Sequence, residues 1–454
     1  MARQAVLIAA LLVSACGEGA QLPLEAGIGP NPTLPAPTKT LIPTVKVADA
    51  KGWPAGAAPT PAPGLKVNAF AQGLQHPRWL LALANGDVLV AESAAPPKPA
   101  QYEDGGIKAW FMKRFMKKAG SAVESANRIT LLRDGDGDGI AEQRSVLLAK
   151  LRSPFGMAMV GDRLFVANAD SLVSYPFSLG QTRIDAAETL VAALPAGRNH
   201  HWTKSLAAAP DGSRLYVGVG SNSNVAEHGM GEEQNRAAIL EIDPGSGATR
   251  VFASGLRNPV GLEFNPWSGQ LWTSVNERDE LGSDLVPDYM TSVRENGFYG
   301  WPWSYYGQIV DDRPKPARPD MVAKAIKPDY ALGAHTASLG LTFSQGQRIA
   351  PMFAQGAFIG QHGSWNRNPP AGYRVIFVPF SGAQPSGMPI EVLTGFLGKG
   401  VAYGRPVGVE IGKDGSLLVA DDVGNTIWRV SSPATAAAAA QRNNQPLPPT
   451  PARR

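Results

Sequence analysis

The chain lacks several features that would place it in common protein classes. It has one cysteine among 454 residues, so a monomer cannot form a disulfide and its stability must come from packing. Its formal net charge is only +4, and no basic block suggests a nucleic-acid surface. Its N-terminal apolar run, residues 5–13, is too short for a stable membrane span. These absences exclude a disulfide scaffold and a nucleic-acid partner.

Apolar residues and turn-forming residues are both abundant. Hydrophobic residues make up 44% of the chain, which is enough to bury a large core. Glycine occurs 50 times and proline 39 times, a composition typical of many short strands joined by turns. The composition therefore favours a large all-β domain.

The N-terminus has the pattern of an export signal. Arg3 precedes the apolar run, and Val13-Ser14-Ala15 precedes Cys16, which predicts a signal peptide over residues 1–15. The site resembles a bacterial lipobox, with Cys16 as the lipidated first residue of the mature chain. This implies a protein anchored to a membrane on the periplasmic side of a bacterial envelope. The alternative is an ordinary signal peptide cut nearby, with Cys16 incidental.

Two segments have little apolar periodicity. Residues 16–63 are rich in Pro, Ala and Thr, which predicts a semi-extended tether between anchor and folded body. Residues 433–454 are Ala-rich and then Pro-rich, which predicts a disordered tail.

Between these segments a strand-turn-strand pattern recurs. Each copy has a small or proline-containing lead, an apolar strand, a polar turn with glycine and a second apolar strand. The copies begin near Pro77, Ser153, Ser205, Asn258, Ser338 and Arg405. Such repetition predicts a six-bladed β-propeller over residues 64–432, with a functional site in the loops at one mouth of its central channel. A sandwich or barrel with a similar strand count is the alternative.

An insertion near residues 105–122 has a different periodicity. Trp110, Phe111 and Phe115 recur at helical spacing beside a cluster of lysines and arginines, which predicts an amphipathic helix with a basic face. The helix could lie on an anionic membrane surface. The simpler interpretation, which we prefer, is a helix packed across the propeller rim.

The segment from Gly255 to Pro302 is the most informative. Arg257 and Asn258 stand in a Gly/Pro frame, a hydrophobic hairpin follows, and a loop crowded with carboxylates and amides ends it. This segment closely resembles the glucose/sorbosone dehydrogenase family, soluble propeller enzymes that use pyrroloquinoline quinone (PQQ). The resemblance covers roughly residues 65–431.

The resemblance implies roles for individual residues. Arg257 and Asn258 match the pair that contacts the cofactor, whose three carboxylates suit a guanidinium. In HHWTKSL, His201 rather than His200 matches the general base that takes the hydroxyl proton as hydride leaves. The alternatives are an arginine that bonds loop carbonyls at a blade entrance and a histidine that is only a hydrogen-bonded loop residue.

The stretch from Val275 to Asp284 matches the family's cofactor-side calcium loop, in which backbone carbonyls do much of the coordination. The resemblance places the ligands near Asn276 and Glu277, with Asp279 or Asp284 in support. Calcium there would polarise the quinone. The sequence departs from well-known members, which carry Gly-Pro at this point, and a solvated acidic turn is the alternative.

Further positions fit a cationic pocket in the same family order. Arg405 matches an arginine near the last blade's entrance. His362 or Arg367 lies near where well-studied members place a lysine, which is absent here. Lys204 could add a cation, and Thr336 with its neighbour His335 could offer hydrogen bonds.

A separate acidic turn spans residues 134–143. Asp134, Asp136 and Asp138 alternate with glycines and Glu142 follows at the ninth position, as at the start of an EF-hand-type calcium loop. The bidentate glutamate expected at position 12 is missing. The turn predicts a structural calcium site away from the channel mouth, with a simple Asp-rich turn as the alternative.

Together these features predict an exported PQQ- and calcium-dependent dehydrogenase acting on an aldose- or sorbosone-like sugar. Its electrons would pass to a periplasmic or membrane acceptor. The rival functions are a non-catalytic, calcium-stabilised binding module of the envelope and a lactonase-like hydrolase on the same architecture.

Overall fold

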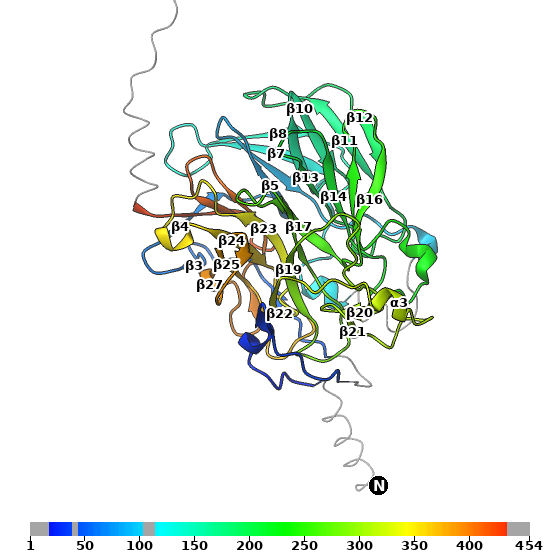
Figure 1. Ribbon diagram of the computed structural model, residues 1–454. Helices are drawn as coiled ribbons and strands as arrows, with labels where there is room; N and C mark the ends of the chain where they lie inside the picture. The colour runs from blue at the N-terminus through cyan, green and yellow to red at the C-terminus, as the bar shows by residue number, and fades with distance from the viewer. Residues whose placement is uncertain (1–17, 39–43, 103–113, 434–454) are drawn as a thin grey trace, which may run out of the picture.

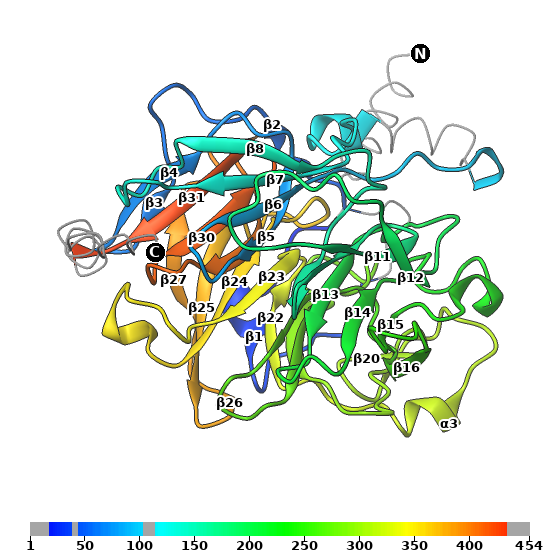
Figure 2. The ribbon, with the colours of Figure 1, turned by 90° about the horizontal axis from the view of Figure 1, so that it is seen from above.

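The computed structural model of the protein describes residues 18–38, 44–102 and 114–433. Within these residues the structure is nearly all β, with six radial sheets (Figure 1). Seen from above, β5 (Pro77–Ala82), β13 (Lys204–Ala208) and β23 (Ser338–Phe343) lie near the middle of the molecule (Figure 2). This arrangement confirms the predicted six-bladed propeller.

Each blade is a four-stranded antiparallel sheet counted outward from the axis. The first three blades are β5 with β6 (Val88–Glu92), β7 (Arg128–Arg133) and β8 (Gln143–Leu148); β9 (Met157–Val160), β10 (Arg163–Ala167), β11 (Ser171–Pro176) and β12 (Thr189–Ala193); and β13 with β14 (Leu215–Val219), β15 (Ala238–Ile242) and β16 (Thr249–Ser254). The next two are β17 (Pro259–Phe264), β18 (Leu271–Val275), β19 (Pro287–Ser292) and β22 (Tyr330–Ala334); and β23 with β24 (Gly356–Gln361), β25 (Arg374–Ser381) and β27 (Ile390–Thr394).

The sixth blade closes the ring by joining distant parts of the chain. Its inner strands are β29 (Pro406–Ile411), β30 (Leu417–Asp421) and β31 (Thr426–Ser431), and its outer strand is β4 (Lys66–Ala71). Trp428 pairs with Ala69 in this register. This pairing of an N-terminal strand with C-terminal strands closes the ring, and the sheet edges that remain along the channel are short.

The remaining elements are short. They are η1 (Leu24–Gly27), β1 (Ile28–Gly29), β2 (Asp49–Ala50), β3 (Thr60–Pro61), η2 (Ala100–Tyr102), η3 (Met230–Glu233), β20 (Ser304–Tyr305), β21 (Ile309–Val310), α3 (Pro319–Val322), η4 (Pro351–Phe353), β26 (Gln384–Pro385) and β28 (Val401–Ala402). No helix among the described residues has the length and apolar character needed to cross a membrane.

Glycines at the start of the inner strands explain how closely neighbouring blades approach. A Cβ on Gly340 would overlap the carbonyl oxygen of Val407 on the next blade. Gly261 stands in the same relation to Leu339, and Gly408 to Arg78. Glycine is required here because the backbone of one blade packs against the backbone of the next.

The predicted free tether is wrong for residues 18–38 and 44–63. Two short strands in this segment extend blade sheets, because β1 pairs with β22 and β3 with β27, while β2 forms a separate two-stranded sheet with β28. Trp53 packs against Phe396 and Trp428 and donates a 2.7 Å hydrogen bond to Asp421. A chain in the polyproline II conformation makes no backbone hydrogen bonds within itself, so its N–H and C=O groups can pair with exposed edges of sheets.

Several predictions fall on residues outside the described ranges. They are the signal peptide with Cys16 and nearly all of the C-terminal tail, residues 434–454. Of the insertion, residues 103–113 also lie outside, whereas residues 114–118 are helical, with Arg114, Lys117 and Lys118 exposed. The choice between membrane and rim therefore stays a prediction.

Candidate functional site

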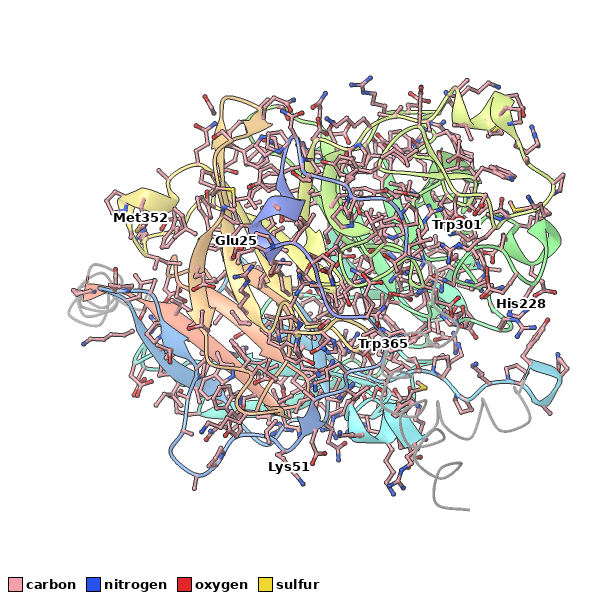
Figure 3. The ribbon with its side chains drawn as sticks, turned by 90° about the horizontal axis from the view of Figure 1, so that it is seen from below. Glu25, Lys51, His228, Trp301, Met352 and Trp365 are labelled. Carbon is pink, nitrogen blue, oxygen red and sulfur yellow. The ribbon has the colours of Figure 1, made fainter. Side chains whose placement is uncertain are left out.

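Strand direction brings the predicted site residues to one end of the central channel. All six inner strands run in the same direction along the channel, and the second strand of each blade runs antiparallel to its inner strand. The residues before each inner strand and the residues after each second strand therefore lie at the same end of the channel. Backbone hydrogen bonds join these two sets: Ser221 donates to Arg257 at 2.8 Å and Asn276 to Asn258 at 3.0 Å. Figure 3 looks onto this end, with Trp365 near the middle and Glu25 and Lys51 of the N-terminal segment above and below it. We call this end the channel mouth.

His201 is held in a form suited to a general base. Its Nδ1 lies 2.8 Å from the carbonyl oxygen of Ser221. A carbonyl only accepts hydrogen bonds, so Nδ1 carries the proton and Nε2 has a free lone pair. Burial, and then the charge of Arg257, holds the pKa of His201 well below its usual value. His201 is therefore neutral near pH 7.

Arg257 and Asn258 lie beside His201. A Cβ on the intervening Gly220 would overlap both Asn258 Oδ1 and the Cβ of His201, so this glycine is what lets the two side chains come together. Asn258 Oδ1 is buried and has no hydrogen-bond partner among the described residues. The mouth thus has an unpaired hydrogen-bond acceptor, Asn258 Oδ1, next to the neutral imidazole of His201.

The guanidinium of Arg257 faces the protein rather than an open space. Nη1 donates to the carbonyl of Glu277 at 2.7 Å, and Nε to the carbonyl of Asn224 at 3.2 Å. Nη2 donates to Asn224 Oδ1 at 3.0 Å and pairs with Asp279 at 3.4 Å. The alternative in which this arginine bonds loop carbonyls is the arrangement observed.

The cofactor-side calcium set does not assemble, which corrects the prediction for Asn276, Glu277, Asp279 and Asp284. The carbonyls of Asn276 and Glu277 accept hydrogen bonds from Arg257, and the Glu277 carboxylate pairs with buried Arg278 at 2.9 Å.

The two aspartates of that set are also engaged. Asp279 pairs with Arg257 and accepts a 2.5 Å hydrogen bond from Asn366, and Asp284 accepts the backbone N–H groups of Gln21 and Leu22. Calcium needs several oxygens converging on one point, and a guanidinium occupies the carbonyls instead.

An arginine and two histidines gather around one carboxylate on the other side of the mouth. Asp422 Oδ2 accepts from Arg78 at 2.5 Å and lies 2.9 Å from His362 Nε2 and 3.5 Å from His76 Nε2. Those neighbours hold the pKa of Asp422 far below its usual value against the opposing effect of burial. Arg405 follows nearby, with its guanidinium 5.0 Å from the ring centre of Tyr373.

This cationic group fits an anionic cofactor such as PQQ. The Nε atoms of Arg78 and Arg405 are buried without a hydrogen-bond partner among the described residues. Arg78, which pairs with Asp422, and Arg405, which donates to the Tyr373 hydroxyl, thus each keep a donor unused. Orphaned donors on guanidinium groups are the chemistry that a polycarboxylate satisfies.

Three other predicted cofactor residues make contacts within the protein. The Lys204 ammonium is fully buried and donates to the Trp202 carbonyl at 3.0 Å. Thr336 Oγ1 donates to Asp288 at 3.1 Å. Arg367 pairs with Asp284 at 3.4 Å, beneath the N-terminal segment. Lys204 and Thr336 thus have their polar groups engaged within the protein, which corrects their assignment, whereas Arg367 Nε is buried without a hydrogen-bond partner among the described residues, so a role for Arg367 stays a prediction.

The acidic turn lies at the opposite end of the propeller, between β7 and β8. Carboxylate oxygens of Asp134, Asp136, Asp138 and Glu142 come within 4.8 Å of one another. Burial is the largest cause that raises the pKa of Asp134, and the charges of Glu142 and Asp138 raise it further. The four predicted ligands therefore converge, in a place remote from His201.

Arg78, His76 and Asp422 were missed by sequence reasoning. The signal was present in the repeats, since PRWLL holds Arg78 one place after its proline and VADD ends a second strand just as SVNE does. Comparing equivalent positions of all six repeats would have found them.

The fold and the mouth together define a six-bladed propeller with a cationic axial site. A family model described as a domain of unknown function, DUF7133, matches residues 84–365. The chain belongs to this family. A second model, described as TrAA12-like, matches residues 320–433.

Two relatives give the range of sequence similarity. An uncharacterized protein of Borreliella burgdorferi is 27% identical over 343 residues, which cover 68% of this chain and 86% of that protein. A pyrroloquinoline quinone-dependent pyranose dehydrogenase of Coprinopsis cinerea is 24% identical over 290 residues, which cover 54% of this chain but only 39% of that enzyme.

Solved structures share the fold. The PQQ domain of the Coprinopsis cinerea pyranose dehydrogenase matches with a TM-score of 0.65 at 20% identity, covering 85% of this chain and all of that domain. The calcium structure of a Trichoderma reesei family AA12 enzyme matches with a TM-score of 0.67 at 18% identity, covering 86% of this chain and 98% of that one. Similarity at this level establishes the propeller architecture.

Proposed function

We propose that the protein is an oxidoreductase that oxidises an aldose- or sorbosone-like sugar with PQQ as its redox cofactor. The observation that carries the proposal is the pairing, at one mouth, of a neutral His201 with a cationic group whose donors are unused. The relatives that use PQQ on pyranoses share this fold, which supports the same chemistry here.

Each residue of the mouth has a distinct role in this reaction. His201 Nε2 takes the proton from the sugar hydroxyl, and the Ser221 carbonyl fixes the ring so that Nε2 stays free. Arg78 and Arg405 bind carboxylates of the cofactor, while Asp422 holds Arg78 and His362 in place. When bound, PQQ supplies an ortho-quinone that accepts hydride. Arg257 is the cation beside the Glu277 carbonyl, so no calcium step is included.

The two rival functions are less well supported. A lactonase-like hydrolase needs a metal held by converging side chains. The one cluster of three or more such ligands in the described part of the chain is the exposed turn at Asp134, at the far end of the propeller. A non-catalytic module does not account for a histidine kept neutral beside unused cationic donors.

The test is reconstitution of the purified protein. Wild type is titrated with PQQ and offered a panel of aldoses with an artificial electron acceptor, alongside His201→Ala. Dye reduction that requires PQQ and falls by about 10²–10⁴-fold in the variant supports the proposal. Sugar binding without reduction would favour the binding module, and PQQ-independent ester cleavage would favour the hydrolase.

We also propose that the protein is exported and lipid-anchored through Cys16, and that a periplasmic or membrane component accepts its electrons. The signal-like pattern of residues 1–15 supports the location. Expression of Cys16→Ser in a bacterium that processes lipoproteins tests it. The variant should move from the membrane to the soluble fraction, and an unchanged distribution would contradict the anchor.

A further inference from the structure

A cavity of about 470 Å³ opens beside the cationic group. It is lined by residues 50–52 of the N-terminal segment, 74–76 before β5, 120 and 123–126 at and just after the end of the insertion, and 422, 423 and 425 after β30. Only the second and fourth of these belong to the blade repeats. The cavity is therefore shaped in part by two segments that lie outside the blade repeats.

The walls formed by the N-terminal segment and by the residues at the end of the insertion are both fixed by hydrogen bonds. Lys51 N donates to the carbonyl of Ala402 at 3.0 Å, which holds the N-terminal wall to the loop before β29. On the insertion side, Ser125 Oγ accepts from the Ala94 N–H at 3.1 Å and donates to Asn127 at 2.8 Å. The walls are thus built before any ligand arrives, as is usual for small-molecule sites.

The polar group at the base of the cavity is Asp422, which is 2% exposed. Its Oδ2 is fully occupied by Arg78, His362 and His76, whereas Oδ1 is buried with no partner among the described residues. A buried carboxylate oxygen left unpaired costs free energy. Asn425 also lines the cavity, and its Oδ1 accepts the His76 N–H at 2.9 Å.

The charge around the cavity favours a neutral ligand with hydroxyl groups. Lys51 and Glu124 carry opposite charges, burial lowers the pKa of His76, and Asp422 is paired with Arg78, so the lining residues carry no excess of positive charge. Leu74, Val123 and Val423 add apolar surface of the kind that packs on C–H groups.

We propose that this cavity binds the part of the sugar substrate that lies away from the reacting carbon, with Asp422 Oδ1 accepting a hydroxyl hydrogen bond. The proposal rests on the proposed sugar oxidation and adds its specificity subsite. The base of the cavity is joined to the reacting end, because the guanidinium of Arg78 lies 5.8 Å from the ring centre of Trp202, the neighbour of His201.

Filling the cavity from its rim tests the proposal without altering the mouth. Val123 is 44% exposed and Val310 is 61% exposed outside the cavity, so Val123→Trp and Val310→Trp form a matched pair. For D-glucose and D-xylose we expect Val123→Trp to raise KM about tenfold with little change in kcat, as expected for lost uniform binding. PQQ affinity and Tm should match wild type, and Val310→Trp should change nothing.

An unchanged KM in Val123→Trp would overturn the subsite, and so would a weakened PQQ affinity, which would assign the cavity to the cofactor. If wild type shows no PQQ-dependent turnover, the proposed oxidation fails on its own and the cavity is judged by binding. Ligand-observed NMR with D-glucose then supports the subsite if wild type binds and Val123→Trp does not. Absence of binding to both proteins overturns it.

Discussion

The base form of His201 depends on a carbonyl and a neighbouring cation rather than on a carboxylate. The Ser221 carbonyl fixes the tautomer, and burial and Arg257 lower the pKa. The acid limb of kcat/KM should therefore lie below pH 6.5, the ordinary value for histidine. Replacing Arg257 with Gln removes one lowering cause, so the limb should move to higher pH, as measured in a pH–rate profile.

The control for that shift is Arg318→Gln, which removes an exposed guanidinium paired with Asp320 at 2.6 Å far from the mouth. It should leave the profile unchanged. A limb that stays in place in Arg257→Gln, or one that lies above pH 7 in wild type, would show that another group takes the proton.

Two glutamates at the far ends of inner strands make stability depend on pH. Burial is the largest cause that raises the pKa of Glu263 to about 8 and that of Glu410 to about 7, from 4.5. A carboxyl group whose pKa is higher in the folded than in the unfolded protein stabilises the fold fully at pH values below its unfolded-state pKa. This contribution is lost as the pH rises through its folded-state pKa. The free energy of unfolding should thus fall between about pH 4.5 and pH 8.

Glu263→Gln should flatten that dependence and stabilise the protein at pH 9 by about 1–3 kcal/mol, as measured by urea unfolding at pH 5 and pH 9. Glu295→Gln, whose side chain is 56% exposed, is the control. Equal slopes in Glu263→Gln and wild type would refute the assignment.

At the scale of elements, the approach of neighbouring inner strands depends on glycine. The Cβ of an alanine at position 340 would overlap the Val407 carbonyl, which belongs to a backbone that cannot move freely. Gly340→Ala should lower the free energy of unfolding by about 1–3 kcal/mol or more. Gly231, where an added Cβ would meet no atom within 4 Å, provides the control substitution to alanine, and thermal denaturation measures both.

The N-terminal segment gives a second prediction at this scale. Trp53→Phe keeps the ring contacts with Phe396 and Trp428 but removes the donor to Asp421, which should cost about 1–2 kcal/mol. Trp53→Ala should cost more. If both variants melt like wild type, residues 44–63 contribute nothing to stability despite their contacts.

The sequence predicted blades better than the site, for a physical reason. Strand and turn signals are local, so the repeats near Pro77 and Arg405 were placed within a few residues of β5 and β29. His201 and Arg405 reached the mouth because strand order places them there. The partner of a long side chain is set by tertiary packing, and for this reason Lys204 was misassigned.

The N-terminal segment was misjudged for a related reason. Pro-rich sequence lacks a periodic apolar face, so nothing in residues 18–63 marks β1 or β3 as strands. Their pairing comes from the sheet edges they meet, such as β22 beside Ile28. Trp53 was the one local signal, since a large aromatic residue in a polar segment usually finds a buried contact.

For the whole molecule, the two predicted calcium sites should behave differently. The turn at Asp134 gathers four carboxylates at one end, while at the other end Arg257 occupies the loop carbonyls. Removing calcium with EGTA should lower Tm by about 2–5 °C and leave PQQ affinity unchanged.

Asp136→Asn should abolish the effect of EGTA on Tm. PQQ binding that is lost on chelation and restored by calcium would show that a metal displaces Arg257 from the Glu277 carbonyl, contrary to the structure. An unaltered melting curve would mean that the acidic turn is only a turn.

The joining of β4 to β31 has a consequence for how the molecule is made. Lys66 of β4 lies opposite Ser431 of β31, so almost the entire polypeptide must leave the ribosome before the ring of blades can close. Until then the first blade and the unfinished last one expose bare edges. Contacts this distant in sequence slow the final step of folding, and an aggregation-suppressing helper should matter most in that interval.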